Sequence, residues 1–164
     1  GVASAEVEAA YAALDAAFER LLDAARADVV IVTADHGFID AGDTVDLDDH
    51  PALRDTLVLP LCGEPRVAYA YVRSGRADEF EDYVNARLAD RVRWFRSETL
   101  VQQGWLGPGA PHPALAGRLG DYVLIPRGNA ILRDWLQGEP RYTHIGVHGG
   151  TSAAEMTVPL VVAG

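Results

Sequence analysis

The chain of 164 residues contains no lysine, because all fourteen of its basic residues are arginine. This absence excludes a lysine Schiff base and the lysine of a Walker-type phosphate loop. Acidic residues number 24, and the net charge of −10 argues against a nucleic-acid polymer or an anionic membrane as the main partner. Phosphate esters stay possible as substrates, because a bound cation dominates the field around its own site.

Cysteine and long apolar runs are also scarce. The one cysteine, Cys62, excludes an intramolecular disulfide and leaves the redox compartment open. Even the longest apolar runs, such as residues 158–163, are far shorter than the roughly 20 residues that a membrane-spanning helix needs. We therefore expect no membrane partner and a cytoplasmic protein, although a signal peptide on a longer parent chain would change the compartment.

The candidate chemistry begins at Asp35 and His36, which follow the apolar run 29–32. Four β-branched residues without alternation predict a strand buried on both faces, as in a parallel sheet covered by helices. In open α/β sheets, ligands bind beyond the carboxyl ends of the strands, where this pair lies. A carboxylate and an imidazole suit Zn²⁺ or a similar divalent ion, and Gly37 permits a sharp turn between them. The alternative is that Asp35 only caps the following loop.

A second segment with candidate metal donors covers residues 143–162. It places His148 in a glycine-rich turn, which is followed by an apolar strand. Between them, Ser152 and Glu155 have the spacing of a capping box at the start of a short helix. The alternative role for His148 is a hydrogen bond within its own turn.

Together the stretches T-A-D-H-G and H-G-G-T-S-A-A-E-M-T-V-P-L resemble the metal-binding segments of the alkaline phosphatase superfamily. The similarity is greatest to its type I phosphodiesterase/nucleotide pyrophosphatase family. This resemblance implies two divalent metal ions, zinc by preference and manganese as the alternative. It assigns Asp35 and His36 to one ion and His148 to the other.

The family also has parts without a counterpart in this sequence. Upstream of the Asp-His-Gly strand, its members carry a first metal-binding Asp, a Thr or Ser nucleophile, and an Asp/His pair for the second metal. We therefore expect the chain to be the C-terminal portion of a larger enzyme, with the N-terminal remainder as its partner. The portion alone should be inactive or nearly so.

The apolar patterns predict an α/β fold with a mostly parallel sheet covered by helices. A helical stripe over residues 4–26, with Ser4 as N-cap, should cover one face of that sheet. Residues 1–50 and 141–164 should form the two parts of an alkaline-phosphatase-like core, present only in part. Residues 51–140 should form a small inserted α+β cap, as related phosphodiesterases carry insertions there.

The predicted cap alternates strands and helices. Strands are expected at residues 67–72, near Trp94 and at residues 121–126, and helices at residues 77–89 and from a cap at Ser97. Tyr69 and Tyr71 could stack a nucleobase, but packing within the sheet is the favoured interpretation.

Several other polar residues are further candidates for a functional site. The acidic loop at 40–51 lacks the spacing of a calcium loop and is interpreted as solvated. The alternative for His50, which lies in this loop, is a contact with the metal site. His144 matches no family ligand. Arg66, Arg127 and Arg141 could bind a phosphate through paired hydrogen bonds, although nothing in the sequence favours one of them over the others. Cys62-Gly-Glu-Pro-Arg has its proline one place late for a sulfatase signature, which excludes that class.

The function expected is that of a metal-dependent phosphohydrolase, most of all a phosphodiesterase or nucleotide pyrophosphatase acting on a small phosphate ester or nucleotide. One alternative is a phosphomonoesterase or phosphosugar mutase of the same superfamily. Another is a non-catalytic interaction domain that retains the fold. The three ligand-type residues and their flanking glycines argue against this last possibility.

Overall fold

The computed structural model describes residues 1–25, 29–136, 138 and 140–163, which fold into two compact units. The first unit joins Gly1–Asp40 to Ile145–Gly164, and the second is the continuous stretch Ala41–His144. The two ends of the chain thus belong to one unit.

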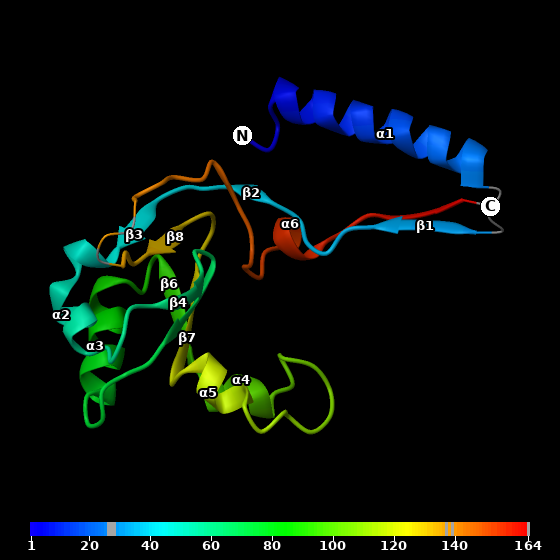
Figure 1. The fold of residues 1–164 in the computed structure, drawn as a ribbon. Coiled ribbons are helices and arrows are strands. Elements are labelled where there is room, and N and C mark those ends of the chain that lie inside the picture. The colour runs from blue at the N-terminus through cyan, green and yellow to red at the C-terminus, as the bar shows by residue number, and fades with distance from the viewer. Residues whose placement is uncertain (26–28, 137, 139, 164) are drawn as a thin grey trace. The chain divides into compact units, whose positions relative to one another are not determined.

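The first unit contains one long helix, two pairs of strands and one short helix (Figure 1). Its elements are α1 (Ala5–Ala25), β1 (Val30–Thr33), β2 (Ile39–Asp40), β9 (Gly146–Val147), α6 (Ala153–Met156) and β10 (Leu160–Ala163).

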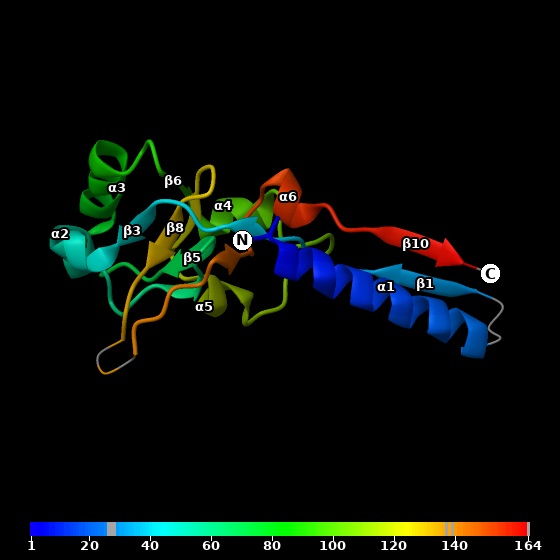
Figure 2. The same ribbon diagram turned by 90° about the horizontal axis from the view of Figure 1, so that it is seen from above.

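Helix α1 begins where the sequence predicts. The Ser4 hydroxyl accepts a hydrogen bond from the Val7 backbone N–H at 3.4 Å, which satisfies one of the donors left free at a helix start. Glu6 and Glu8 lie in the first turn, where the helix dipole favours negative charge. The predicted end at Arg26 lies outside the described residues. Figure 2 shows α1 running beside the strand pair β1 and β10.

Strands β1 and β10 pair with each other, as expected for the first and last strands of the chain. The pairing is antiparallel, with Val30 opposite Ala163, so the prediction of parallel neighbours is wrong here. An apolar run in the sequence predicts that a strand is buried, but it does not predict the direction of the neighbouring strand. Burial on both faces is not found either, because Ile31 is 62% exposed. The faces of a sheet are buried only where another layer of structure packs against them, and Ile31 lies on a face without such cover.

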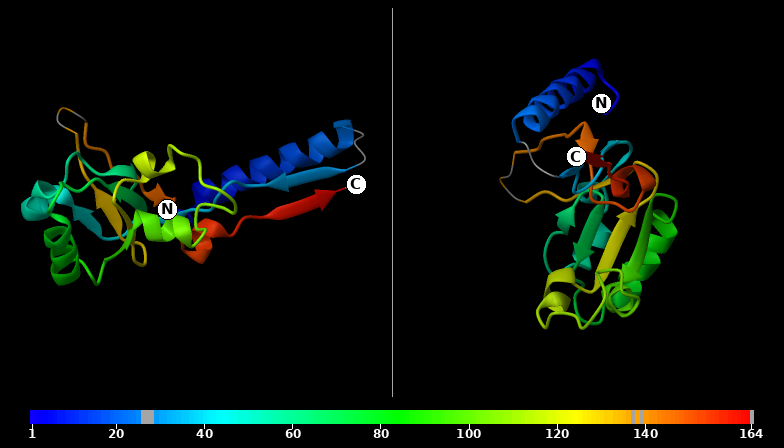
Figure 3. Two further views of the ribbon diagram at one scale, coloured as in Figure 1. Left: turned by 90° about the horizontal axis from the view of Figure 1, so that it is seen from below. Right: turned by 90° about the vertical axis from the view of Figure 1, so that its right-hand side faces the viewer.

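The second unit is built around a four-stranded sheet (Figure 3). The strands of this unit are β3 (Thr44–Asp46), β4 (Cys62–Glu64), β5 (Val67–Ala70), β6 (Val92–Arg96), β7 (Tyr122–Pro126) and β8 (Ile131–Arg133). Strands β4 to β7 form the four-stranded sheet, and β3 pairs with β8. Its helices are the 3-10 turn η1 (Leu47–Asp49) and α2 (Pro51–Asp55), α3 (Ala77–Arg87), α4 (Ser97–Gln102) and α5 (Leu115–Leu119).

The order in the main sheet is β4-β5-β7-β6, and all of its pairs are antiparallel. Helices α2 and α3 bury their apolar residues on one face, where Leu53, Phe80 and Leu124 form part of one core cluster. On the other face Leu100 of α4 packs with Val123. Every residue of the central strand β7 is buried, since successive side chains point to opposite, covered faces.

The strands and helices predicted for the cap region are therefore present. Tyr69 packs beside the second cluster, which is the structural role favoured from the sequence. Ser97 differs from the prediction, because it is the first residue of α4 and not its cap. Its hydroxyl is buried and donates to the Leu119 carbonyl at 3.1 Å, so the tertiary contact replaces the local one.

Parallel pairing occurs once among the described strands, between β3 and β8. Within that same part of the chain, no helix combines the length and hydropathy needed to cross a bilayer. Whether the second unit is an insertion into a larger catalytic core stays a prediction.

Candidate functional site

The first candidate donors lie in the turn that follows β1. His36 Nδ1 lies 3.0 Å from the Gly37 carbonyl oxygen. A carbonyl can only accept, so Nδ1 carries the proton and, in the neutral ring, Nε2 keeps a free lone pair. Metal-binding histidines commonly hold their second nitrogen to a backbone carbonyl in this way.

Asp35 lies next to that free nitrogen. Its Oδ1 is 3.7 Å from His36 Nε2, and its side chain is 89% exposed. Oδ1 also accepts the His36 backbone N–H at 3.0 Å, which fixes the carboxylate relative to the ring. Two ligand atoms on one tetrahedral zinc ion stand roughly 3.3 Å apart, so the observed spacing needs only a small adjustment to suit a shared ion.

Gly37 brings this turn against α6. Its N–H donates to the Glu155 carbonyl at 2.8 Å. A Cβ at position 37 would lie 2.0 Å from the Ala154 carbonyl oxygen, a distance that no side chain can occupy. Glycine is therefore required by the close approach of two backbones.

The capping box predicted at the start of α6 is present. Ser152 Oγ accepts from the Glu155 N–H, while the Glu155 carboxylate accepts from Ser152 Oγ at 2.6 Å. Glu155 also accepts from the Gly150 N–H at 2.9 Å and is buried. These bonds shape the turn that carries His148.

The structure brings His148 onto His36. The two imidazole rings are stacked, with centroids 3.8 Å apart and an interplanar angle of 12°. Phe38 meets both rings edge-on, with each centroid distance 5.1 Å. Phe38 was not anticipated as part of this cluster. Its only signal in the sequence is its position directly after the Asp-His-Gly turn.

The three predicted ligand residues therefore lie together, although they are 113 positions apart at the extremes (148 − 35). Among the described residues, no group of three or more His, Cys, Asp or Glu side chains has the arrangement of a metal site. Asp35, His36 and His148 thus do not form a closed metal site by themselves, and their assignment as ligands stays a prediction.

A large cavity opens beside these donors within the first unit. Its volume is about 1340 Å³. It is lined by the apolar stripe of α1 and by the segment with the donors, including Val7, Leu14, Phe18, Val32, Asp35 and His36. Asp35 and His36 therefore border an open space instead of being packed into a core.

The remaining candidates lie in the second unit and are engaged in local contacts. His50 Nδ1 is 3.0 Å from the Tyr83 hydroxyl, and the His144 ring meets Tyr142 at 4.8 Å between centroids. The three candidate arginines bind protein groups: Arg66 and Arg127 bind backbone carbonyls, and Arg141 binds Asp48. These contacts explain why such side chains occur there without a phosphate.

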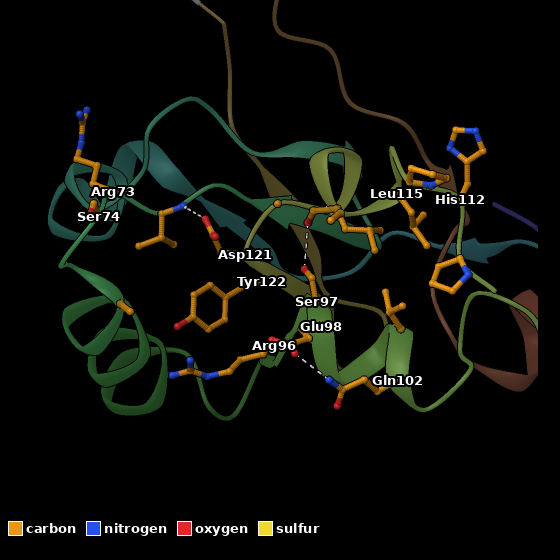
Figure 4. Close-up of a pocket in the computed structure, with 18 of the residues that line it drawn as sticks. Arg73, Ser74, Arg96, Ser97, Glu98, Gln102, His112, Leu115, Asp121 and Tyr122 are labelled. Carbon is orange, nitrogen blue, oxygen red and sulfur yellow. Dashed lines mark hydrogen bonds between the residues drawn. The ribbon is translucent and has the colours of Figure 1, made fainter. Parts of the chain in front are cut away.

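The second unit has a cavity of its own, of about 600 Å³, between α4, α5 and the loop before α3 (Figure 4). Several of its polar groups are bonded to protein partners. Asp121 accepts the Val72 N–H at 2.7 Å and Glu98 accepts from Gln102 at 2.8 Å. Burial, and then a hydrogen bond to Glu81, raise the pKa of Tyr122 to about 12. The cavity draws its lining from three separate segments, so no local sequence pattern marks it.

Residues 1–151 match the sequence profile of the type I phosphodiesterase/nucleotide pyrophosphatase family. A search of curated proteins gives no significant match. Among solved structures, the chain is similar to murine ectonucleotide pyrophosphatase/phosphodiesterase 5, with 21% identity and a TM-score of 0.62. For the human counterpart the sequence identity is 19% and the TM-score is 0.61. For phosphonoacetate hydrolase from Sinorhizobium meliloti 1021, in complex with phosphonoformate, the identity is 22% and the TM-score is 0.59.

These similarities cover most of this chain but a minor part of the other proteins. The match to the murine protein covers 88% of this chain and 36% of that one. The match to the hydrolase covers 86% of this chain and 37% of that one. The chain thus spans little more than a third of these similar structures, and at such identities the likeness establishes the fold.

Proposed function

The chain belongs to the type I phosphodiesterase/nucleotide pyrophosphatase family, and on that premise we propose that it is the C-terminal portion of a metal-dependent phosphoric ester hydrolase. The observation that carries this proposal is the stack of His36 on His148 with Asp35 beside it. Two ions about 4 Å apart, each about 2 Å from its ligand, require the two rings to lie within roughly 8 Å. The centroid distance of 3.8 Å meets that requirement.

The donor set suits zinc or a similar divalent ion. Asp35 Oδ1 and His36 Nε2 would hold one ion, and His148 would hold the second. The backbone carbonyl of Gly37 keeps His36 in the tautomer that a metal ligand needs. When bound, such ions supply Lewis-acid stabilisation of the charge on a phosphoryl oxygen and a more acidic water.

This chain's own residues then have positioning roles. Gly37 and the Ser152–Glu155 capping box hold the two donor turns against each other. Phe38 packs edge-on against both imidazoles and limits their rotation. The Thr or Ser nucleophile expected for the family has no assigned residue in this chain and would come from the N-terminal remainder.

Exposed apolar surface in the first unit supports a larger catalytic domain. The strand pair leaves Ile31, Leu160 and Val162 each more than 60% exposed. Apolar side chains on a sheet face are stabilised when another layer covers them. The similar solved structures are nearly three times longer than the matched region, so a covering layer from the remainder of the enzyme fits both observations.

A small phosphate ester or nucleotide is the proposed substrate class. One similar structure, of the murine protein, is a complex with AMP, and another, of the hydrolase, contains phosphonoacetate. A phosphomonoesterase or phosphosugar mutase is the alternative within the superfamily. Comparing rates on a phosphate diester and on the matching monoester separates these activities.

Metal binding can be tested on the 164-residue chain. Titration with Zn²⁺ or Mn²⁺, followed by calorimetry, should show binding that His36→Ala and His148→Ala each weaken. His144→Ala is the matched control, since that histidine contacts Tyr142 in the second unit. Equal loss in the control variant would mean that the ion binds histidines nonspecifically.

Turnover is tested on the intact parent enzyme. Asp35→Ala or His148→Ala should lower hydrolysis of a bis-aryl phosphate by orders of magnitude, because charge stabilisation is the main catalytic term in such sites. Near-normal hydrolysis by both variants would refute the assignment. The 164-residue chain alone should show little or no turnover.

A further inference from the structure

A second, smaller cavity of the second unit is lined by none of the metal-ligand candidates. Its volume is about 290 Å³, and it lies between β4 and the segment that contains β8. Its polar and aromatic lining consists of Cys62, Glu64, Arg133, Asp134, Trp135 and Tyr142. At about 30 Å³ per water, the volume equals that of roughly ten water molecules, which suits a small metabolite.

Arg133 is the exceptional residue of this cavity. It is only 8% exposed, and its Nη2 is fully buried without a hydrogen-bond partner among the described residues. Its guanidinium lies over the rings of Trp135 and Tyr142, at 5.4 Å and 5.7 Å from their centroids. Ring contacts recover part of the lost hydration, but a buried guanidinium without a counter-charge still costs free energy.

The neighbouring acids are engaged by other groups. Asp134 accepts from Arg54 at 2.8 Å and from the Leu61 N–H at 2.9 Å. Asp46 accepts the Trp135 indole N–H at 3.0 Å. Neither carboxylate forms an ion pair with Arg133 in the described part of the chain, so the charge of this arginine calls for an anion from outside.

Glu64 supplies the opposite charge in the same cavity. It is exposed, and its side chain has neither a hydrogen bond nor an ion pair within the residues that the structure describes. Glu64 and Arg133 line one small space without forming a salt bridge to each other. A ligand that carries a negative and a positive group would satisfy both side chains.

We propose that this cavity binds a small zwitterion of the amino-acid type. Its carboxylate accepts hydrogen bonds from the Arg133 guanidinium, and its ammonium group lies toward Glu64. Trp135 and Tyr142 line the same cavity, where they would lie beside the carbon atoms between the two charges. A dianion is disfavoured, because it would face Glu64 and an acidic protein of net charge −10. This site does not depend on the proposed hydrolase function.

The choice of ligand is tested by calorimetric titration of the 164-residue chain with four probes. These are L-alanine, propionate, ethylammonium and inorganic phosphate. L-alanine should bind at least about tenfold more tightly than propionate or ethylammonium, since each of those satisfies only one of the two charges. Inorganic phosphate should bind more weakly than L-alanine.

Three variants assign the binding to the two side chains. Arg133→Met retains an unbranched side chain of similar reach and should abolish binding of both L-alanine and propionate. Glu64→Gln should reduce the affinity for L-alanine to that for propionate and leave propionate unchanged. Arg118→Met, an exposed arginine of α5 outside the cavity, is the matched control and should leave every affinity unchanged.

Several results would overturn the proposal. They are no saturable binding of L-alanine, equal affinities for L-alanine and propionate, tighter binding of phosphate, or unchanged binding in a folded Arg133→Met variant. If Arg133→Met does not fold, the probe series on the native chain and on Glu64→Gln still decides, because position 64 is exposed.

Discussion

At the scale of single residues, Gly37 connects the two donor turns most directly. We expect Gly37→Ala to destabilise the first unit by about 1–3 kcal/mol, because the new methyl group would lie 2.0 Å from the Ala154 carbonyl oxygen. Chemical denaturation measures this loss. The substitution should also separate the stacked histidines. The affinity for Zn²⁺ should therefore fall by more than the loss of stability alone would cause.

The control for that substitution is Gly117→Ala in α5. A Cβ at position 117 meets no atom within 4 Å, and alanine is favoured over glycine in a helix by about 1 kcal/mol. This variant should be neutral or slightly more stable than the native chain. A Gly37→Ala protein of unchanged stability would show that the two backbones are not in close contact.

The free energy of unfolding should depend on pH through His50. Burial, and then the positive charge of Arg91, lower the pKa of His50 below its ordinary value of 6.5. The unfolded chain therefore takes up this proton first as the pH falls. The stability contributed by neutral His50 is present above about pH 6.5 and is lost as the pH falls toward the lower folded pKa.

The measurement for His50 is denaturation of the native chain and of His50→Asn between about pH 8 and pH 5. Asparagine does not titrate, and it retains a polar group near Tyr83 Oη. The variant should show a flatter pH profile over this range. Parallel profiles would show that His50 has the same pKa in both states.

At the scale of elements, the central strand β7 should dominate the stability of the second unit. Leu124 is 1% exposed and belongs to the core cluster beneath α2 and α3. Leu124→Ala should lower the free energy of unfolding by about 2–5 kcal/mol through lost burial and the cavity left behind. Leu106→Ala, at 48% exposure, should change it by less than about 0.5 kcal/mol. Similar losses in the two variants would contradict the observed packing.

At the scale of the whole molecule, the two units should differ in stability. The described strands of the first unit form two-stranded pairs, and large apolar side chains on them are in contact with water. The second has a four-stranded sheet with a buried central strand. Isolated two-stranded ribbons are marginally stable, so backbone amides of β1 and β10 should exchange with deuterium much faster than those of β7. Equal protection in a hydrogen-exchange experiment would contradict this expectation.

The sequence predicted those features that depend on neighbouring residues. The Ser4 cap, the Ser152–Glu155 capping box and the helices and strands of the second unit arise from local hydrogen bonds and periodic burial, which short segments encode. The candidate site was identified from two short motifs, because a metal-donor pattern is local even when its two halves are far apart.

Only the tertiary structure decided how those halves meet. It stacked His36 on His148, added Phe38 to the pair, and made β1 and β10 antiparallel. An apolar run indicates that a strand seeks burial, but its partner and direction depend on residues remote in the sequence. The sequence by itself therefore determined the elements, the family and the candidate donors. The fold decided the strand direction, the packing of the site and the uncompensated charge of Arg133, because long-range contacts leave no local pattern.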